Sequence, residues 1–200
     1  MSTNRKVLVF AGSTRVASLN RTLALAAAGV AAELGAQAPH LELKEYPLPL
    51  YDGDHEATHG SPPNVSVLRS ALKAHDVWLI ASPDYNSSIA PILKNLIDWV
   101  SRPCDGEDYV ACFKGRTVGI MSSSPGSSGG SRGLPHLRQV LTHLGANVLA
   151  EQFTVPRGAT AFSDDGHLAE IARAELLRRF VSSALASADI PNRIERVHAA

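Results

Sequence analysis

Residues 7–20 of the chain read VLVFAGSTRVASLN, and this stretch decides how the rest is interpreted. The apolar run Val7–Ala11 is typical of a buried strand, and the alanine-rich stretch from Arg21 to Leu34 predicts a helix. The first turn of a helix has unpaired backbone N–H groups and a partial positive charge from the helix dipole. A strand that leads through a short Gly/Ser/Thr loop into such a helix therefore predicts an anion site, here for a monophosphate.

Polar side chains in this loop add to the predicted anion site. Ser13, Thr14, Ser18 and Asn20 are short hydrogen-bonding residues, and Arg15 has a guanidinium that can donate two parallel hydrogen bonds to a phosphate. The loop lacks both the Gly-x-x-x-x-Gly-Lys-Ser/Thr pattern of nucleotide triphosphate sites and the Gly-x-Gly-x-x-Gly pattern of dinucleotide sites. The alternative is that Arg15 is an ordinary surface arginine.

The remainder of the chain alternates predicted strands and helices. Further strands are predicted at Leu41–Leu43, Val77–Ala81, Arg116–Met121 and Asn147–Val155, and further helices at 64–74, 91–101, 134–144 and 168–186, with a long irregular segment from Pro47 to Pro63. Five strands alternating with five helices predict a three-layer α/β domain with a parallel sheet. Ligands of such sheets bind beyond the carboxyl ends of the strands.

Three loops of unusual composition follow predicted strands. They are Gly12–Asn20, Ser82–Ile89 and Ser122–Gly130. In the strand order 2-1-3-4-5 the first and third strands flank the switch point, so we expect the three loops to meet in one pocket. The second loop offers Tyr85 and a run of backbone groups to a flat ring, and the glycines of the third permit close backbone approach. A phosphate grip beside a cradle for a flat ring suggests FMN.

The sequence resembles the NADPH-dependent FMN reductase family, which includes quinone, azo and chromate reductases. Residues 12–20 match the family pattern G-S-x-R-x-x-S-x-N, residues 83–89 match P-E-Y-N-x-S-I/P, and residues 93–99 match L-K-N-A-I-D-W. A third match is Gly129-Gly130 with Arg132 and residues 136–141. The resemblance runs from about Val7 to Val155 and implies a flavodoxin-like fold with sheet order 2-1-3-4-5 and helices on both faces.

The resemblance implies a set of cofactor-binding residues. Those around the FMN phosphate would be Ser13, Arg15, Ser18, Leu19 and Asn20; those along the ribityl chain and isoalloxazine would be Pro83, Asp84, Tyr85, Asn86 and Ser87; and Ser123 or Ser124, with Gly126, would close the ring side. Asp84 stands where the family usually has Glu, so its carboxylate is one methylene shorter. The change is harmless if the position works through its backbone, and it affects the site if the side chain contacts the ring or a neighbouring subunit. Tyr85 has the alternative role of packing beneath its loop.

The implied activity is that of an NAD(P)H-dependent oxidoreductase. Hydride would pass from NADPH or NADH to flavin N5, and electrons then to a small-molecule acceptor such as a quinone, azo compound, metal oxyanion or free flavin. The cofactor carries this chemistry, so we predict no catalytic acid or base. Alternatives are a flavodoxin-like electron carrier without NAD(P)H turnover, and a phosphosugar- or nucleotide-binding module.

Composition excludes several other classes. The 200 residues suit one domain, predicted over 1–186, with a loose tail at 187–200. Nineteen basic and nineteen acidic residues argue against nucleic-acid binding. Cys104 and Cys112 form no C-x-x-C pair, and His55 and His59 lie in a segment with no predicted helix to align them, so no metal site is expected. No signal-peptide core or membrane-length apolar run is present, which predicts a cytoplasmic protein.

Two further expectations concern partners and a misleading motif. The resemblance implies a homodimer or homotetramer, with contacts expected at Tyr46–Tyr51 and Pro91–Trp99. Residues 129–133 match the Gly-x-Ser-x-Gly elbow of hydrolases around Ser131, but nine residues separate this serine from Met121 at the predicted strand end. An elbow serine follows its strand directly, so we do not expect a hydrolase.

Overall fold

A parallel sheet forms the centre of the molecule. The structure, a computed structural model, describes residues 5–104 and 106–188. The strand order is β2-β1-β3-β6-β7, with β8 also beside β6, and every pairing in this sheet is parallel. The strands are β1 (Val7–Ala11), β2 (His40–Leu41), β3 (Val77–Ala81), β6 (Thr117–Ser123), β7 (Asn147–Val148) and β8 (Phe153–Val155). The predicted order 2-1-3-4-5 is confirmed, with β7 and β8 sharing the fifth position.

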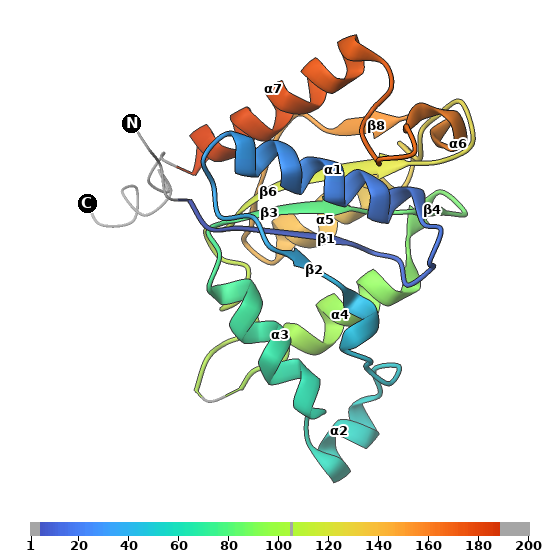
Figure 1. The fold of residues 1–200 in the computed structure, drawn as a ribbon. Coiled ribbons are helices and arrows are strands. Elements are labelled where there is room, and N and C mark those ends of the chain that lie inside the picture. The colour runs from blue at the N-terminus through green and yellow to red at the C-terminus, as the bar shows by residue number, and fades with distance from the viewer. Residues whose placement is uncertain (1–4, 105, 189–200) are drawn as a thin grey trace.

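Helices cover both faces of the sheet (Figure 1). On one face lie α1 (Leu19–Glu33) and α7 (Ile171–Ser187), and on the other lie α3 (Pro63–Lys73), α4 (Pro91–Val100) and α5 (Leu134–His143). Successive side chains of a strand point to opposite faces of the sheet. In β1, Leu8 and Phe10 therefore pack in the core under α3–α5, and Val7 and Val9 pack in the core under α1 and α7. Both cores exist because the strands are apolar on both faces.

Small residues let the helices α1 and α7 approach the sheet closely. Ala24, Ala27 and Ala31 of α1 are fully buried against it. At Gly119 in β6, an added Cβ would lie 2.9 Å from the ring of Phe180 in α7. Gly119 therefore leaves the space that the Phe180 ring occupies, and a larger residue would force the helix outward.

Several predicted boundaries are wrong because short elements were not visible in the sequence pattern. The predicted strand at Leu41–Leu43 is β2 followed by a 3₁₀ turn from Leu43, the predicted loop 82–89 contains the hairpin of β4 (Asp84–Tyr85) and β5 (Ser88–Ile89), and Ser122–Ser123 belong to β6. The fifth strand is interrupted between β7 and β8, where the Arg138 guanidinium donates to the carbonyls of 148–150. A short helix, α6 (Gly158–Ala161), follows β8.

The segment predicted to be irregular, Pro47–Pro63, contains the helix α2 (Gly53–His59). The Asp52 carboxylate caps α2 by accepting hydrogen bonds from the N–H groups of Asp54 and His55. The interpretation that no helix aligns His55 and His59 is wrong, because both residues belong to α2. The centroids of their stacked rings lie 4.4 Å apart. Among the described residues, no group of three or more His, Cys, Asp or Glu side chains is placed to hold a metal ion.

The carboxyl end of the chain lies partly outside the described residues. Ser187, the first residue of the predicted tail, still belongs to α7, and residues 189–200 lie outside the description. The final helix begins at Ile171 rather than Leu168. Within the described ranges, no helix has the length and apolar character needed to cross a bilayer. The division into one domain at 1–186 and a tail stays a prediction.

Candidate functional site

A cavity of about 290 Å³ lies beyond the carboxyl ends of β1, β3 and β6. The three predicted loops meet there, together with the start of α6. Most of the predicted site residues line this cavity: Ser13, Arg15, Ser18, Leu19, Asn20, Pro83, Asp84, Tyr85, Ser123 and Ser124. Its wall also includes Ala17, Pro125 and Ala159. Asn86, Ser87 and Gly126 do not line it. The switch-point argument thus places the cavity correctly.

The first loop combines a capped helix start with an unpaired cation. Ser18 is the N-cap of α1 and its hydroxyl oxygen accepts a hydrogen bond from the N–H of Arg21 at 3.2 Å. The buried Ser13 hydroxyl oxygen accepts from the N–H of Arg15 at 3.3 Å. The Arg15 side chain is exposed at the cavity, and no described residue pairs with its guanidinium. Its donors are therefore available to an anion.

Asn20 has a structural role that local sequence reasoning missed. Its side-chain amide donates to the carbonyl of Ser123 and its amide oxygen accepts from the N–H of Ser123, both at 2.9 Å. The Ser123 hydroxyl in turn donates to the carbonyl of Val155 at 3.2 Å. These bonds join the start of α1 to the end of β6 and occupy both side chains. Of the two serines predicted to close the ring side, Ser124 is the one whose hydroxyl makes no described hydrogen bond.

The second loop is a hairpin whose turn has left-handed backbone. Asn86 and Ser87 have φ of 54° and 62°, the conformation of a two-residue turn between antiparallel strands. The Asp84 carboxylate accepts from the N–H groups of Ser87 at 2.8 Å and Gly133 at 3.2 Å. It therefore ties the hairpin to the start of α5. Tyr85 is 44% exposed, so its ring is not packed beneath the loop.

The third loop is held by α6, which the sequence did not predict. The carbonyls of Ser124 and Gly126 accept from the N–H groups of Gly158 at 2.8 Å and Arg157 at 3.0 Å. A Cβ on Gly158 would lie 2.3 Å from the Ser123 hydroxyl, so only glycine fits here. Ala159, the next residue, lines the cavity. Ser131 lies in a turn well beyond the end of β6 and is not among the residues that line the cavity.

Residues 5–160 match the family model described as NADPH-dependent FMN reductase. The chain belongs to this family. The NAD(P)H-dependent FMN reductase of Pseudomonas aeruginosa is 35% identical over 181 residues, covering 90% of this chain and 92% of that protein. A probable NADPH:quinone oxidoreductase of rice, Oryza sativa subsp. japonica, is 40% identical over 137 residues, covering 68% of this chain and 63% of the rice protein.

Solved structures agree with this membership. The flavoenzyme NAD(P)H:(acceptor) oxidoreductase FerB from Paracoccus denitrificans superimposes with a TM-score of 0.79 at 27% identity, covering 92% of this chain and 97% of FerB. A flavodoxin from Pseudomonas aeruginosa, at 13% identity over 92% of this chain and 99% of its own, has a TM-score of 0.54 and shows the fold alone. The predicted family, flavodoxin-like fold and oxidoreductase class are confirmed, and the family is one of FMN reductases with NAD(P)H dependence.

Proposed function

We propose that the protein binds FMN in the 290 Å³ cavity, oxidises NAD(P)H and passes the electrons to a quinone or another small-molecule acceptor. The observation that carries the proposal is the convergence of Arg15, the first turn of α1 and the β4–β5 hairpin on one cavity. When bound, FMN supplies the chemistry, since its N5 can take a hydride from nicotinamide and its reduced ring can reduce an acceptor.

The chain's own residues bind and orient the cofactor in this proposal. Arg15 donates to the phosphate with the hydroxyl of Ser18 and the free N–H groups at the start of α1, including that of Leu19. Pro83, the backbone of Asp84 and Tyr85 would lie along the ribityl chain and ring, and Ser124 would close the ring side. Asn20, Ser123 and Asp84 act through their hydrogen bonds, which hold the three loops together.

Asp84 differs from the usual family residue, and its contacts make the difference tolerable. Its carboxylate is used by the N–H groups of Ser87 and Gly133. A shorter side chain that reaches these backbone groups still fixes the hairpin, so the cavity keeps its shape. We propose that the position acts through these bonds rather than by touching the ring.

The identity of the electron acceptor is a separate question from the oxidation of NAD(P)H. Relatives are named for quinone reduction and for FMN reduction, which supports quinones and free flavin before azo compounds or metal oxyanions. An electron carrier without NAD(P)H turnover is the competing function. The family membership and the names of the relatives favour the reductase.

The decisive experiment is an absorbance spectrum of the purified protein with FMN, followed by anaerobic NADPH. We expect flavin absorbance that bleaches on addition and returns when a benzoquinone is supplied. Flavin that binds but stays oxidised in NADPH would support the electron carrier instead. A protein that binds no FMN would overturn the proposal at its first step.

Assembly and location complete the proposal. We propose a homodimer or homotetramer in the cytoplasm. Asn95 and Trp99 of α4 donate to the carbonyl of Pro49 at 2.9 and 2.8 Å, so the segment 46–51 is fixed on α4 while Leu50 stays 81% exposed. The family resemblance, rather than this single exposed leucine, is what supports a contact between copies at this segment. Light scattering across a dilution series tests the assembly, and a mass that stays at one chain would overturn it.

A further inference from the structure

A second cavity, of about 350 Å³, adjoins the proposed FMN cavity. It lies on the other side of α6: Ala159 lines the FMN cavity, whereas Thr160 lines the second. The loop after β6 borders both, through Ser124 on one side and Ser127 on the other. Figure 1 shows α6 beside this loop and near the start of α7. A ligand that extends from the flavin over α6 would reach the second cavity.

Arg157, in this second cavity, has a backbone conformation that side chains rarely adopt. Its φ is 51° and its ψ is 41°, in the left-handed region where glycine or asparagine is usual. Hydrogen bonds hold it there: its N–H donates to the carbonyl of Gly126 at 3.0 Å, and its carbonyl accepts from the N–H of Thr160 at 3.0 Å. Strain kept in this way is typical of functional positions. An arginine where glycine would fit better therefore points to a role for its side chain.

The charges around the cavity favour an anion. Arg157 is exposed, and no described residue pairs with its guanidinium. Arg173 donates to the Glu170 carboxylate and to the carbonyl of Thr154, both at 3.3 Å, which leaves further N–H donors on its guanidinium. Two guanidinium groups and one carboxylate line the cavity, so it is positive on balance. The Ser127 hydroxyl adds a short donor, whereas the Thr160 hydroxyl already donates to the carbonyl of Arg157 at 3.2 Å.

We propose that this cavity binds the 2′-phosphate of NADPH and makes Arg157 the residue that selects NADPH over NADH. Arg157 donates to the phosphate oxygens, Arg173 supports it from α7, and Glu170 limits the attraction. The two dinucleotides differ by this phosphate alone, so a cationic cavity one helix away from the flavin is where they are told apart. The inference rests on the proposed function, because it assumes that the nicotinamide reaches the flavin.

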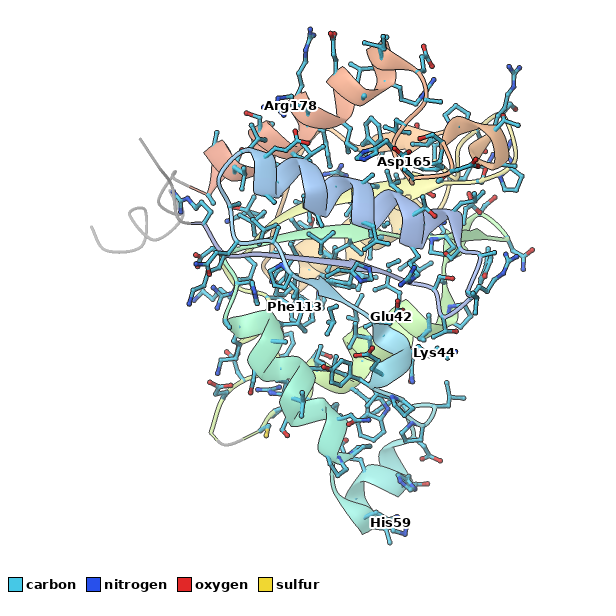
Figure 2. All side chains as sticks on the ribbon, viewed as in Figure 1. Glu42, Lys44, His59, Phe113, Asp165 and Arg178 are labelled. Carbon is cyan, nitrogen blue, oxygen red and sulfur yellow. The ribbon has the colours of Figure 1, made fainter. Side chains whose placement is uncertain are left out.

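Arg157→Gly tests the inference without harming the fold. Glycine relieves the left-handed strain, so the melting temperature of the variant stays the same or rises. Loss of a charge-assisted hydrogen bond raises the KM for NADPH about tenfold and leaves the KM for NADH unchanged. The control is Arg178→Gln, which removes the same charge from α7 at an ion pair with Glu33, away from α6 in Figure 2. It changes neither KM.

Glu170→Gln gives an expectation of the opposite sign. Removing the carboxylate makes the cavity more positive, so the KM for NADPH falls severalfold while that for NADH stays the same. A variant of Arg157 or Glu170 that shifts both KM values together, or neither, overturns the inference. So does a wild-type enzyme that uses NADH as well as NADPH.

A binding measurement separates failure of the inference from failure of the proposed function. Calorimetry of the FMN-loaded protein with adenosine 2′,5′-bisphosphate and with 5′-AMP needs no turnover. We expect only the bisphosphate to bind, and its affinity to drop about tenfold in Arg157→Gly. If neither dinucleotide is oxidised, the proposed function fails, and this comparison still decides whether the cavity holds the 2′-phosphate. Equal binding of both nucleotides overturns the inference.

Discussion

Two regions beside the same cavity differ in how strongly the fold holds their side chains in place. At the junction of α1 and β6, Asn20 and Ser123 are buried and hydrogen-bonded to each other. In the loop just before α1, residues 14–17 are all exposed, with Val16 at 85%. The junction is fixed by folding, whereas the loop offers groups that only a ligand would engage. Substitutions at the junction should therefore lower stability, and substitutions in the loop should lower affinity.

The largest effect is expected for Asn20→Ala. This change leaves the N–H and carbonyl of Ser123 buried without their partner, because both bonds come from one side chain. We expect the free energy of unfolding to fall by about 3 kcal/mol, as for two unsatisfied buried polar groups. Urea denaturation without FMN measures it. Asn64→Ala, which removes an exposed hydrogen bond to Pro47, serves as the control and should lose less than about 1 kcal/mol.

A small loss in Asn20→Ala would contradict the distinction between the two regions. Asn20→Asp sharpens the test, since its carboxylate can still accept from the N–H of Ser123 but cannot donate to the carbonyl. The second carboxylate oxygen would face the Ser123 carbonyl in a buried position, so we expect the aspartate variant to lose at least as much stability as the alanine variant.

Arg15→Ala should have the next largest effect, on binding alone. The exposed guanidinium has no described partner, so the apo protein should unfold at the same urea concentration as the wild type. FMN affinity should weaken by about 2 kcal/mol, the range for a charge-assisted hydrogen bond to a phosphate. Fluorescence titration with FMN measures this. Unchanged FMN affinity would show that Arg15 does not bind the phosphate. Lowered stability of the apo protein would show that the Arg15 side chain contributes to folding.

Asp84→Asn should cost about 1 kcal/mol of stability. The amide oxygen of asparagine can accept one of the two backbone hydrogen bonds, but its NH₂ group cannot accept the other. Thermal unfolding measures the loss. Asp108→Asn is the matched control, because it keeps an oxygen for its single exposed bond from Val110. Equal losses in the two variants would show that Asp84 does not tie the hairpin to α5.

Tyr85→Ala should have the smallest effect on stability, within about 0.5 kcal/mol, because the ring is 44% exposed. We expect the ratio of kcat/KM values for a large and a small quinone to change, while the affinity for FMN stays within a factor of two or so. Steady-state kinetics with benzoquinone and a naphthoquinone measure it. A loss of stability near 2 kcal/mol would instead make Tyr85 a packing residue.

The sequence predicted the parts of the fold that depend on local pattern. Val7–Ala11 and Val77–Ala81 were predicted to the residue, because each is apolar on both faces. The position of the cavity followed from strand order. The Asn20–Ser123 pair could not be predicted locally, since its members are 103 residues apart. The hairpin at 84–89 was missed because strands of two residues have no periodicity, whereas α2 had a readable signal in its cap, Asp52.

Both free edges of the sheet are short. One edge is β2, of two residues, and the other is β7 and β8, of two and three residues, with Arg138 occupying the carbonyls between them. A long edge strand presents a row of open backbone groups onto which another chain can add a strand. Here neither edge offers such a row. The interruption of the fifth strand thus protects the protein against edge-to-edge aggregation, and it does so with one guanidinium group.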